Sequence, residues 1–397
     1  MLFFKKKKSE PKKPLGLYVH IPFCIKKCNY CDFLSAPATT QVQNAYMEAL
    51  LTEIREADVP GDRAVKEDTV VSVFIGGGTP SAVEPEWITK VLKAVRERFV
   101  FGENVEITME MNPGTVTSES LLEYRRAGVN RLSIGCQSTR DEELRRIGRI
   151  HNYKQFLDTY NAVREAGFKN VNVDLMSALP NQSIEEWEEN LRTILSLQPQ
   201  PEHISAFSLI VEEGTPFYSL YEKGELSLPD EDEERQMYWL ADKILQEAGY
   251  THYEISNYAK EGYACRHNCG YWTRRNYLGF GIGAASLYDN VRFRNGDALQ
   301  DYLRAPGECR EEIQELDLRE QMDETMFLGL RMLDGVDLEA FYQKFDIRAE
   351  EFYGRQIAEC VEEGLLVQGK DRIFLTKRGL DLSNYVMAGF LEEIPER

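Results

Sequence analysis

The chain has 397 residues, 43% of them hydrophobic and 11% aromatic, which is enough for one large core with a smaller appended unit or for a few modest domains. Its 66 acidic and 47 basic side chains give a net charge of −19, which repels phosphate backbones and argues against nucleic acid as the main partner. No apolar run approaches the roughly 18 residues of a membrane span and no secretory signal is recognisable, so we expect a cytoplasmic protein.

Residues 1–14 contain six lysines against one glutamate, which predicts a flexible basic arm. Only Leu2, Phe3 and Phe4 offer apolar side chains for a bilayer, so at most a peripheral membrane contact is expected.

Between residues 15 and 225, short β-branched runs alternate with longer stretches of helical periodicity. This alternation is typical of βαβ units and a parallel sheet. Six repeats fall short of a full eight-stranded barrel, so we predict an α/β fold with a partial (β/α)6 barrel. The expected strands are 15–21, 70–78, 105–111, 131–137, 171–179 and 203–211. The expected helices are 44–57, 84–99, 120–128, 152–167 and 183–197.

Polar and sulfur-bearing residues follow these strands. Three cysteines come after the first strand and the motif GGGTP (76–80) after the second, while Glu110 and Gln137 end the third and fourth. Asp174 lies within the fifth strand. Because barrel chemistry gathers at the C-terminal ends of the strands, these residues are expected at one rim.

The remaining chain is predicted to form two further parts. Residues 226–310 extend the barrel, with a helix over 230–249 and less regular segments at 251–272 and 279–286. Residues 311–397 contain helical stretches at 320–333 and 349–364, then two short strands about a polar turn within 365–379. This order suggests a smaller winged-helix-like C-terminal domain that packs on the barrel or covers it.

Eight cysteines in a chain of this class are not a disulfide framework. Cys309 and Cys360, in helix-like stretches, are expected in the core, as is Cys136 unless it faces a pocket.

The clustered cysteines, Cys24, Cys28 and Cys31, have the spacing of metal ligands. Structural zinc needs four ligands, and Cys265, Cys269 or His267 could supply the fourth. An iron–sulfur cube needs one ligand per iron, so three thiolates leave one iron open to a small molecule.

The spacing C-x3-C-x2-C on a loop after the first barrel strand resembles the radical S-adenosylmethionine (SAM) superfamily. The resemblance implies a [4Fe-4S] cluster on these cysteines, with SAM on the open iron and reductive cleavage of its C–S bond to a 5′-deoxyadenosyl radical. Gly77, Gly78 and Thr79 would then bind the amino group of SAM. Tyr30 would shield the cluster; ordinary loop packing is the alternative.

Over the whole chain, the motifs LYVHIPFC, GGGTP, EMNPG, GCQS and DLMSALP are similar to those of the oxygen-independent coproporphyrinogen III oxidase family, a porphyrin biosynthesis family. Ser208 matches a SAM-contacting position of that family less securely. The resemblance assigns SAM contact to Tyr18, Gly78, Thr79, Glu110, Gln137, Arg149 and Asp174. A structural salt bridge is the alternative role for the charged members.

The chain departs from the decarboxylating branch in two places. Phe33 stands where that branch has a fourth cysteine, and only the 14 mostly polar residues of the arm precede the first expected strand. Both departures match the haem chaperone branch, the HemW type, which also has the signature H-N-x-x-Y-W. That signature corresponds here to His267, Asn268, Tyr271 and Trp272.

The segment HNCGYW also has a physical interpretation. Its imidazole could ligate haem iron, its aromatic rings could flank a macrocycle, and Arg274 and Arg275 suit propionates. The alternatives are a hydrogen-bonded histidine at a turn with Trp272 as a core plug, or ligation by Cys265 or Cys269.

We therefore expect a haem chaperone with a [4Fe-4S] cluster and exchangeable SAM, whose partners are haem, an acceptor protein and an electron donor. Coproporphyrinogen oxidase activity is expected to be lacking. The alternatives are an oxygen-independent coproporphyrinogen III oxidase and a structural zinc protein.

Overall fold

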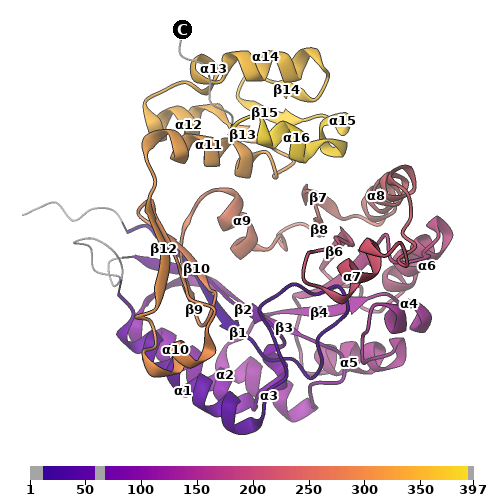
Figure 1. The fold of residues 1–397 in the computed structure, drawn as a ribbon, viewed down its shortest axis with the longest axis vertical. Helices are drawn as coiled ribbons and strands as arrows, with labels where there is room; N and C mark the ends of the chain where they lie inside the picture. The colour runs from indigo at the N-terminus through magenta and orange to yellow at the C-terminus, as the bar shows by residue number, and fades with distance from the viewer. Residues whose placement is uncertain (1–11, 59–67, 392–397) are drawn as a thin grey trace, which may run out of the picture.

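The computed structural model describes residues 12–58 and 68–391, so most of the predicted basic arm lies outside the described residues. Six parallel strands form the centre of the fold, and helices cover their outer face (Figure 1). The strands are β1 (Pro14–Ile21), β2 (Thr69–Gly77), β3 (Val100–Met111), β4 (Arg131–Gln137), β5 (Val171–Ser177) and β6 (His203–Ser208). The helices are α1 (Thr40–Glu56), α2 (Pro85–Arg98), α3 (Ser118–Ala127), α4 (Asp141–Arg146), α5 (Tyr153–Glu165) and α6 (Ile184–Leu195). This arrangement confirms the predicted partial (β/α)6 barrel.

Local signals in the sequence explain where the helices begin and end. Helices α3, α5 and α6 each start with a capping box, in which the side chain of Thr117, Asn152 or Ser183 accepts a backbone N–H of the first turn. Gly128 ends α3 in a left-handed conformation with φ of 105°, which glycine adopts without steric cost.

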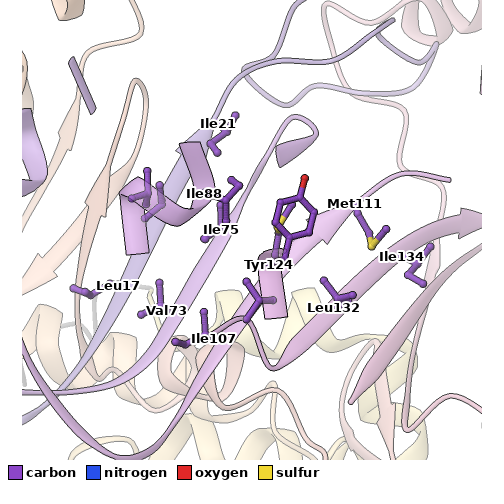
Figure 2. Close-up of a cluster of buried hydrophobic side chains, with 14 of the residues drawn as sticks. Leu17, Ile21, Val73, Ile75, Ile88, Ile107, Met111, Tyr124, Leu132 and Ile134 are labelled. Atoms are coloured by element: carbon purple, nitrogen blue, oxygen red, sulfur yellow. The ribbon is translucent and has the colours of Figure 1, made fainter. Parts of the chain in front are cut away.

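The central strands bury apolar residues on one face and polar residues on the other. Figure 2 shows the apolar row, in which Val73, Ile107 and Leu132 of three neighbouring strands pack near Ile88 of α2 and Tyr124 of α3. Each of these side chains is at most 4% exposed. The alternate positions point into the barrel and carry mostly polar side chains, which prepares the interior for a ligand.

The segment after β6 adds strands to both edges of the sheet. The full sheet has twelve strands in the order β12-β11-β10-β9-β1-β2-β3-β4-β5-β6-β8-β7. Strand β9 pairs parallel to β1 and covers an edge that would otherwise be open. These elements are α7 (Pro216–Glu222), α8 (Glu231–Glu247), β7 (Thr251–Glu254), β8 (Asn257–Ala259), α9 (Arg266–Trp272), β9 (Asn276–Phe280), β10 (Ala285–Tyr288), β11 (Val291–Asn295), α10 (Leu299–Arg304) and β12 (Arg310–Glu315).

The strands at these edges were not expected from the sequence. Strands β7 to β11 have only three to five residues each, too few for periodicity to identify them. The boundary expected at 310/311 falls at the start of β12, which belongs to the large sheet.

The smaller C-terminal domain has its own core, which includes Met326, Phe341, Ile373 and Val386. Its three-stranded antiparallel sheet, in the order β13-β15-β14, packs with helices in the predicted winged-helix-like manner. The elements are α11 (Leu318–Gly329), β13 (Val336–Asp337), α12 (Leu338–Phe345), α13 (Ala349–Phe352), α14 (Gly354–Glu362), β14 (Leu366–Gln368), β15 (Arg372–Leu375), α15 (Lys377–Asp381) and α16 (Ser383–Ala388).

Two local expectations are wrong. The helix expected over 349–364 is broken at Tyr353, whose φ and ψ of −99° and 14° interrupt the helical path between α13 and α14. Cys309 lies in the loop between α10 and β12 and is only partly buried, whereas Cys360 in α14 and Cys136 in β4 are core residues as expected. Within the described ranges, no helix is long and apolar enough to cross a membrane.

Candidate cofactor site

A cavity of about 450 Å³ opens at the C-terminal ends of the central strands. The loop that follows β1 brings Cys24, Cys28 and Cys31 to its wall. Burial raises the pKa of the Cys31 thiol, and the neighbouring Cys28 and Cys24 act in the same direction, so these sulfur atoms lie within interaction range. The three side chains are partly exposed toward the cavity.

The glycine turn after β2 forms a second wall. Gly77 has a φ of +106°, and a Cβ atom on Gly78 would lie 2.7 Å from the carbonyl oxygen of Phe23. A larger residue at either position would therefore be strained or would displace the cysteine loop. Thr79 lies behind the cavity wall, with its hydroxyl 3.4 Å from Cys24 Sγ.

Two carboxyl groups face the cavity from the barrel interior. Glu110 is reached by the backbone N–H of Gly77 at 3.1 Å, and Asp174 accepts hydrogen bonds from Asn172 at 2.6 Å and from Ser133 at 3.2 Å. Burial, followed by the charge of Asp174, raises the pKa of Glu110 to about 7. Burial also raises the pKa of Asp174 above its ordinary value. Such perturbed carboxyls in a cavity are typical of ligand sites.

Arg149 and Gln137 complete the polar lining. The Arg149 guanidinium donates to the carbonyl oxygen of Gly135 at 2.6 Å and lies 3.7 Å from Cys28 Sγ. Gln137 has a φ of +68°, an unfavourable conformation for a non-glycine residue, and its buried Oε1 has no hydrogen-bond partner in the described part of the chain. A strained residue with an unsatisfied buried oxygen at a cavity wall indicates a functional position.

Asn112 lines the same cavity and was not singled out from the sequence. Its side chain donates to Thr79 Oγ1 at 2.7 Å and accepts from Arg149 at 2.5 Å, so it connects the glycine turn to the arginine. The sequence signal that could have identified Asn112 is its position in the EMNPG motif, directly after the end of β3.

The structure collects most of the predicted cofactor residues in this cavity. Beyond the three cysteines they are Tyr30, Gly77, Gly78, Glu110, Gln137, Arg149, Asp174 and Ser208. Tyr18 does not line it; its ring faces an adjoining cavity and its hydroxyl lies 3.0 Å from His20 Nδ1.

The donor set fits a cluster better than a single metal ion. Within the described residues, no three His, Cys, Asp or Glu side chains converge closely enough to hold one ion. The thiolates of a cubane cluster bind different irons, so they need not converge on one point. The residues lining the cavity include no fourth cysteine and no histidine.

The alternative zinc ligands lie elsewhere. Cys265 Sγ is 3.6 Å from Glu106 Oε1, and Glu106 is four residues before Glu110 on β3. Four residues of an extended strand span roughly 13 Å, so Cys265 lies well below the cysteine loop.

His267, on α9, lies inside the barrel and is only 3% exposed. Its Nδ1 is 3.0 Å from Ser72 Oγ and its Nε2 is 2.9 Å from Tyr271 OH, so both ring nitrogens are engaged. Burial, with Arg275 and Arg131, lowers the pKa of His267 to about 3, which keeps the imidazole neutral. Ligation of a metal through this ring would require one of the two hydrogen bonds to break.

The rest of the α9 segment lies between the sheet and the C-terminal domain (Figure 1). The Trp272 ring is covered by the Arg331 guanidinium at 4.3 Å, and Asn268 is partly buried. Arg274 donates to Glu324 at 2.6 Å and is 7% exposed, so this guanidinium is already paired. Arg275 donates to the carbonyl oxygen of Arg266 at 3.1 Å.

Two family models match the chain. Residues 18–194 match the Radical SAM superfamily, and residues 316–382 match the HemN C-terminal domain.

Full-length relatives are also found. The haem chaperone HemW of Lactococcus lactis is 36% identical over 380 residues, which cover 96% of this chain and 98% of that protein. The haem chaperone HemW of Escherichia coli is 35% identical over 388 residues, with 96% and 99% covered. The solved structure of coproporphyrinogen III oxidase (HemN) from Escherichia coli, a radical SAM enzyme, covers 96% of this chain and 91% of that chain with a TM-score of 0.81. At 23% sequence identity, this match shows a shared fold alone.

Proposed function

Because this chain belongs to the radical SAM family that includes the haem chaperone HemW, we propose that it binds haem and transfers it to an acceptor protein. The observation that carries the proposal is the cysteine loop, in which Cys24, Cys28, Cys31 and Phe33 all line the cavity. By the resemblance described above, Phe33 stands where the decarboxylating branch has a fourth cysteine. The full-length relationship to haem chaperones supports the same assignment.

Cys24, Cys28 and Cys31 would hold a [4Fe-4S] cluster whose fourth iron faces the cavity. When bound, the cluster and SAM supply one-electron chemistry at the sulfonium group. Gly77 and Gly78 let the turn after β2 pack closely against His20 and Phe23, which brings its backbone to the cavity wall, and Tyr30 lines the same cavity.

The polar side chains would position SAM. Glu110 and Asp174 can accept hydrogen bonds from ribose hydroxyls, and their negative charge would favour the cationic sulfonium. Arg149 and Gln137 offer donors for a carboxylate or for the adenosyl group.

The segment His267, Asn268, Tyr271 and Trp272 is the proposed haem-associated element. It packs on β2 inside the barrel and against α11 of the C-terminal domain, so it connects both parts of the chain. The proposal requires an acceptor haemoprotein and an electron donor as partners.

Haem titration followed by transfer tests the proposal. Purified protein with its cluster reconstituted is titrated with haem, then mixed with an apo-haemoprotein whose activity is monitored. We expect stoichiometric binding of haem. We also expect the apo-haemoprotein to recover its activity faster with the haem-loaded protein than with free haem. Absence of saturable haem binding would contradict the proposal.

The decarboxylase alternative is tested separately. Coproporphyrinogen III is incubated anaerobically with the reconstituted protein, SAM and a reductant, and the product is measured. We expect no turnover above that of a cluster-free control. Multiple turnovers would contradict the chaperone proposal and would show that the protein is a coproporphyrinogen oxidase.

The cluster assignment has its own test. Anaerobic reconstitution of the Cys31→Ala variant should give substantially less iron and sulfide than wild type, with loss of the charge-transfer absorption. The matched control is Cys309→Ala, which removes a partly exposed cysteine outside the cavity. Equal iron content in Cys31→Ala and wild type would remove this loop from the cluster site.

A further inference from the structure

A second cavity, of about 370 Å³, adjoins the cysteine-lined one. The two cavities share Phe33, Gly77 and Glu110 as a common wall. Phe33 is 62% exposed at the entrance to both, so its ring separates them without being fixed in the core. A ligand in one cavity therefore lies directly beside a ligand in the other.

Four of the ten residues that line the second cavity are tyrosine or phenylalanine. Tyr18 and Tyr277 contribute from neighbouring strands, Tyr271 contributes from α9, and Phe33 closes the outer side. Tyr271 and Tyr277 meet edge to face, with ring centroids 4.7 Å apart and planes at 88°. Such walls offer large flat surfaces to an aromatic ligand.

The charged residues of the lining indicate which ligands the second cavity can bind. No arginine or lysine lines this cavity, and Glu110 is its one carboxyl group among the described residues. His20 also lines it, but both ring nitrogens are engaged, Nδ1 3.0 Å from Tyr18 OH and Nε2 2.8 Å from the carbonyl oxygen of Leu34. Burial lowers the pKa of this imidazole, so the ring adds no positive charge to the lining at neutral pH. Carboxylates and phosphates would find no cationic partner there. The lining suits the apolar, flat part of a ligand whose acidic groups remain outside.

His267 is hydrogen-bonded to the hydroxyl group of Tyr271, which lines the cavity. Ser72 Oγ, the His267 ring and Tyr271 OH form a hydrogen-bonded chain with steps of 3.0 Å and 2.9 Å. The Phe74 ring supports the imidazole, with centroids 5.2 Å apart. His267 does not line the second cavity, whereas Tyr271 does.

We propose that the second cavity receives the carboxylate-free edge of the tetrapyrrole against Tyr271, Tyr277 and Phe33, and that His267 acts as a positioning residue for Tyr271. This inference rests on the proposed function, because it assumes that the chain binds haem. It assigns to His267 an orienting role in place of iron ligation.

Metal-free protoporphyrin IX tests the ring contacts, because it has no iron to ligate. Fluorescence titration of the full-length, reconstituted protein is compared for wild type, Tyr277→Ala and Phe33→Asp. Each variant is expected to bind about tenfold more weakly, the effect of losing one aromatic contact. Phe33 is exposed, so its substitution leaves the core intact. Tyr385→Ala is the control, since Tyr385 is 61% exposed on α16 and lines neither cavity.

His267→Ala separates positioning from ligation. A positioning residue predicts that haem and metal-free protoporphyrin lose affinity by the same factor, with partial recovery in His267→Gln, whose amide can hydrogen-bond to Tyr271. A larger loss for haem alone, with a changed Soret band, would overturn the positioning role.

The outcomes also distinguish this inference from the proposed function. If wild type binds neither haem nor protoporphyrin, both fail. If wild type binds both ligands and the Tyr277→Ala and Phe33→Asp variants bind protoporphyrin with the same affinity as wild type, only the proposal for the second cavity is overturned. A second equivalent of SAM that displaces protoporphyrin would assign the cavity to a nucleoside instead.

Discussion

Glu110 stands at the point where the two cavities meet, and its protonation is set by its surroundings. Its carboxyl group is buried in the barrel interior near Asp174, and both factors favour the neutral form. A cationic ligand such as a sulfonium would reverse this preference, because it stabilises the carboxylate. The residue therefore responds to what occupies the site.

The raised pKa of Glu110 has a consequence for the stability of the cofactor-free protein. An unfolded carboxyl loses its proton near 4.5, whereas folded Glu110 keeps it up to about 7. The unfolded state thus binds fewer protons in this window, so the contribution of Glu110 to the free energy of unfolding falls as pH rises from 4.5 through 7.

We expect Glu110→Gln to gain stability relative to wild type as pH rises, on the order of 3 kcal/mol between pH 4.5 and 8. Urea unfolding of the cofactor-free proteins at several pH values measures this difference. Glu103→Gln is the control, since Glu103 is an exposed residue of the same strand. If the difference in the free energy of unfolding between Glu110→Gln and wild type does not vary with pH, burial does not raise the pKa of this carboxyl group.

At the scale of single elements, α9 depends on a side chain from another element. Glu106 of β3 accepts the backbone N–H groups of Arg266 and His267, each at 3.0 Å, and so caps the first turn of α9. Glu106 is 4% exposed and also lies near the buried Arg131. A helix of seven residues has little stability of its own, so this cap anchors it.

Glu106→Ala should therefore loosen α9. The substitution removes the acceptor of the Arg266 N–H and of the buried His267 N–H, and it removes a negative charge near Arg131, with an expected loss of about 3 kcal/mol in the free energy of unfolding. In this variant, the hydrogen-exchange rate of the α9 amides should increase more than that of the amides in the central strands. Glu103→Ala is the matched control, and equal exchange in both variants would contradict the capping role.

At the scale of the whole molecule, ionic contacts join the C-terminal domain to the barrel. Glu324 of α11 pairs with Arg274 and with Arg292 of β11, each at 2.6 Å. Arg274 is 7% exposed, so the ion pair with Glu324 is largely shielded from solvent. On the other side, Trp239 of α8 donates to Asp381 of α15 at 2.7 Å. The domain is thus held at both edges of the barrel opening.

Glu324→Ala should weaken this junction strongly, because it leaves a buried guanidinium unpaired at a cost of about 3 kcal/mol. We expect a lower thermal midpoint and faster proteolysis in the segment between β12 and α11. Glu359→Ala, which breaks the exposed pair of Glu359 with Arg355, is the control and should change little. Similar midpoints for the two variants would show that the Glu324 contacts do not hold the domain.

The sequence by itself determined the central barrel and the residues of its rim. The β-branched strands and most of the amphipathic helices between 15 and 211 have local periodicities strong enough to identify them, whereas the six-residue α4 was not expected because it is too short to show a period. The cysteines and most of the predicted SAM contacts then meet because parallel strands bring their C-terminal ends to one edge.

Only the tertiary structure decided what the α9 segment does within the barrel. The sequence offers His267 as a ligand or as a buried hydrogen-bonding residue, and its burial and partners come from Ser72, Tyr271 and Glu106. The short outer strands and the cavity shared by Phe33 and Glu110 also arise from contacts between distant segments. Such contacts leave no local period in the chain, because they depend on how the barrel closes around α9.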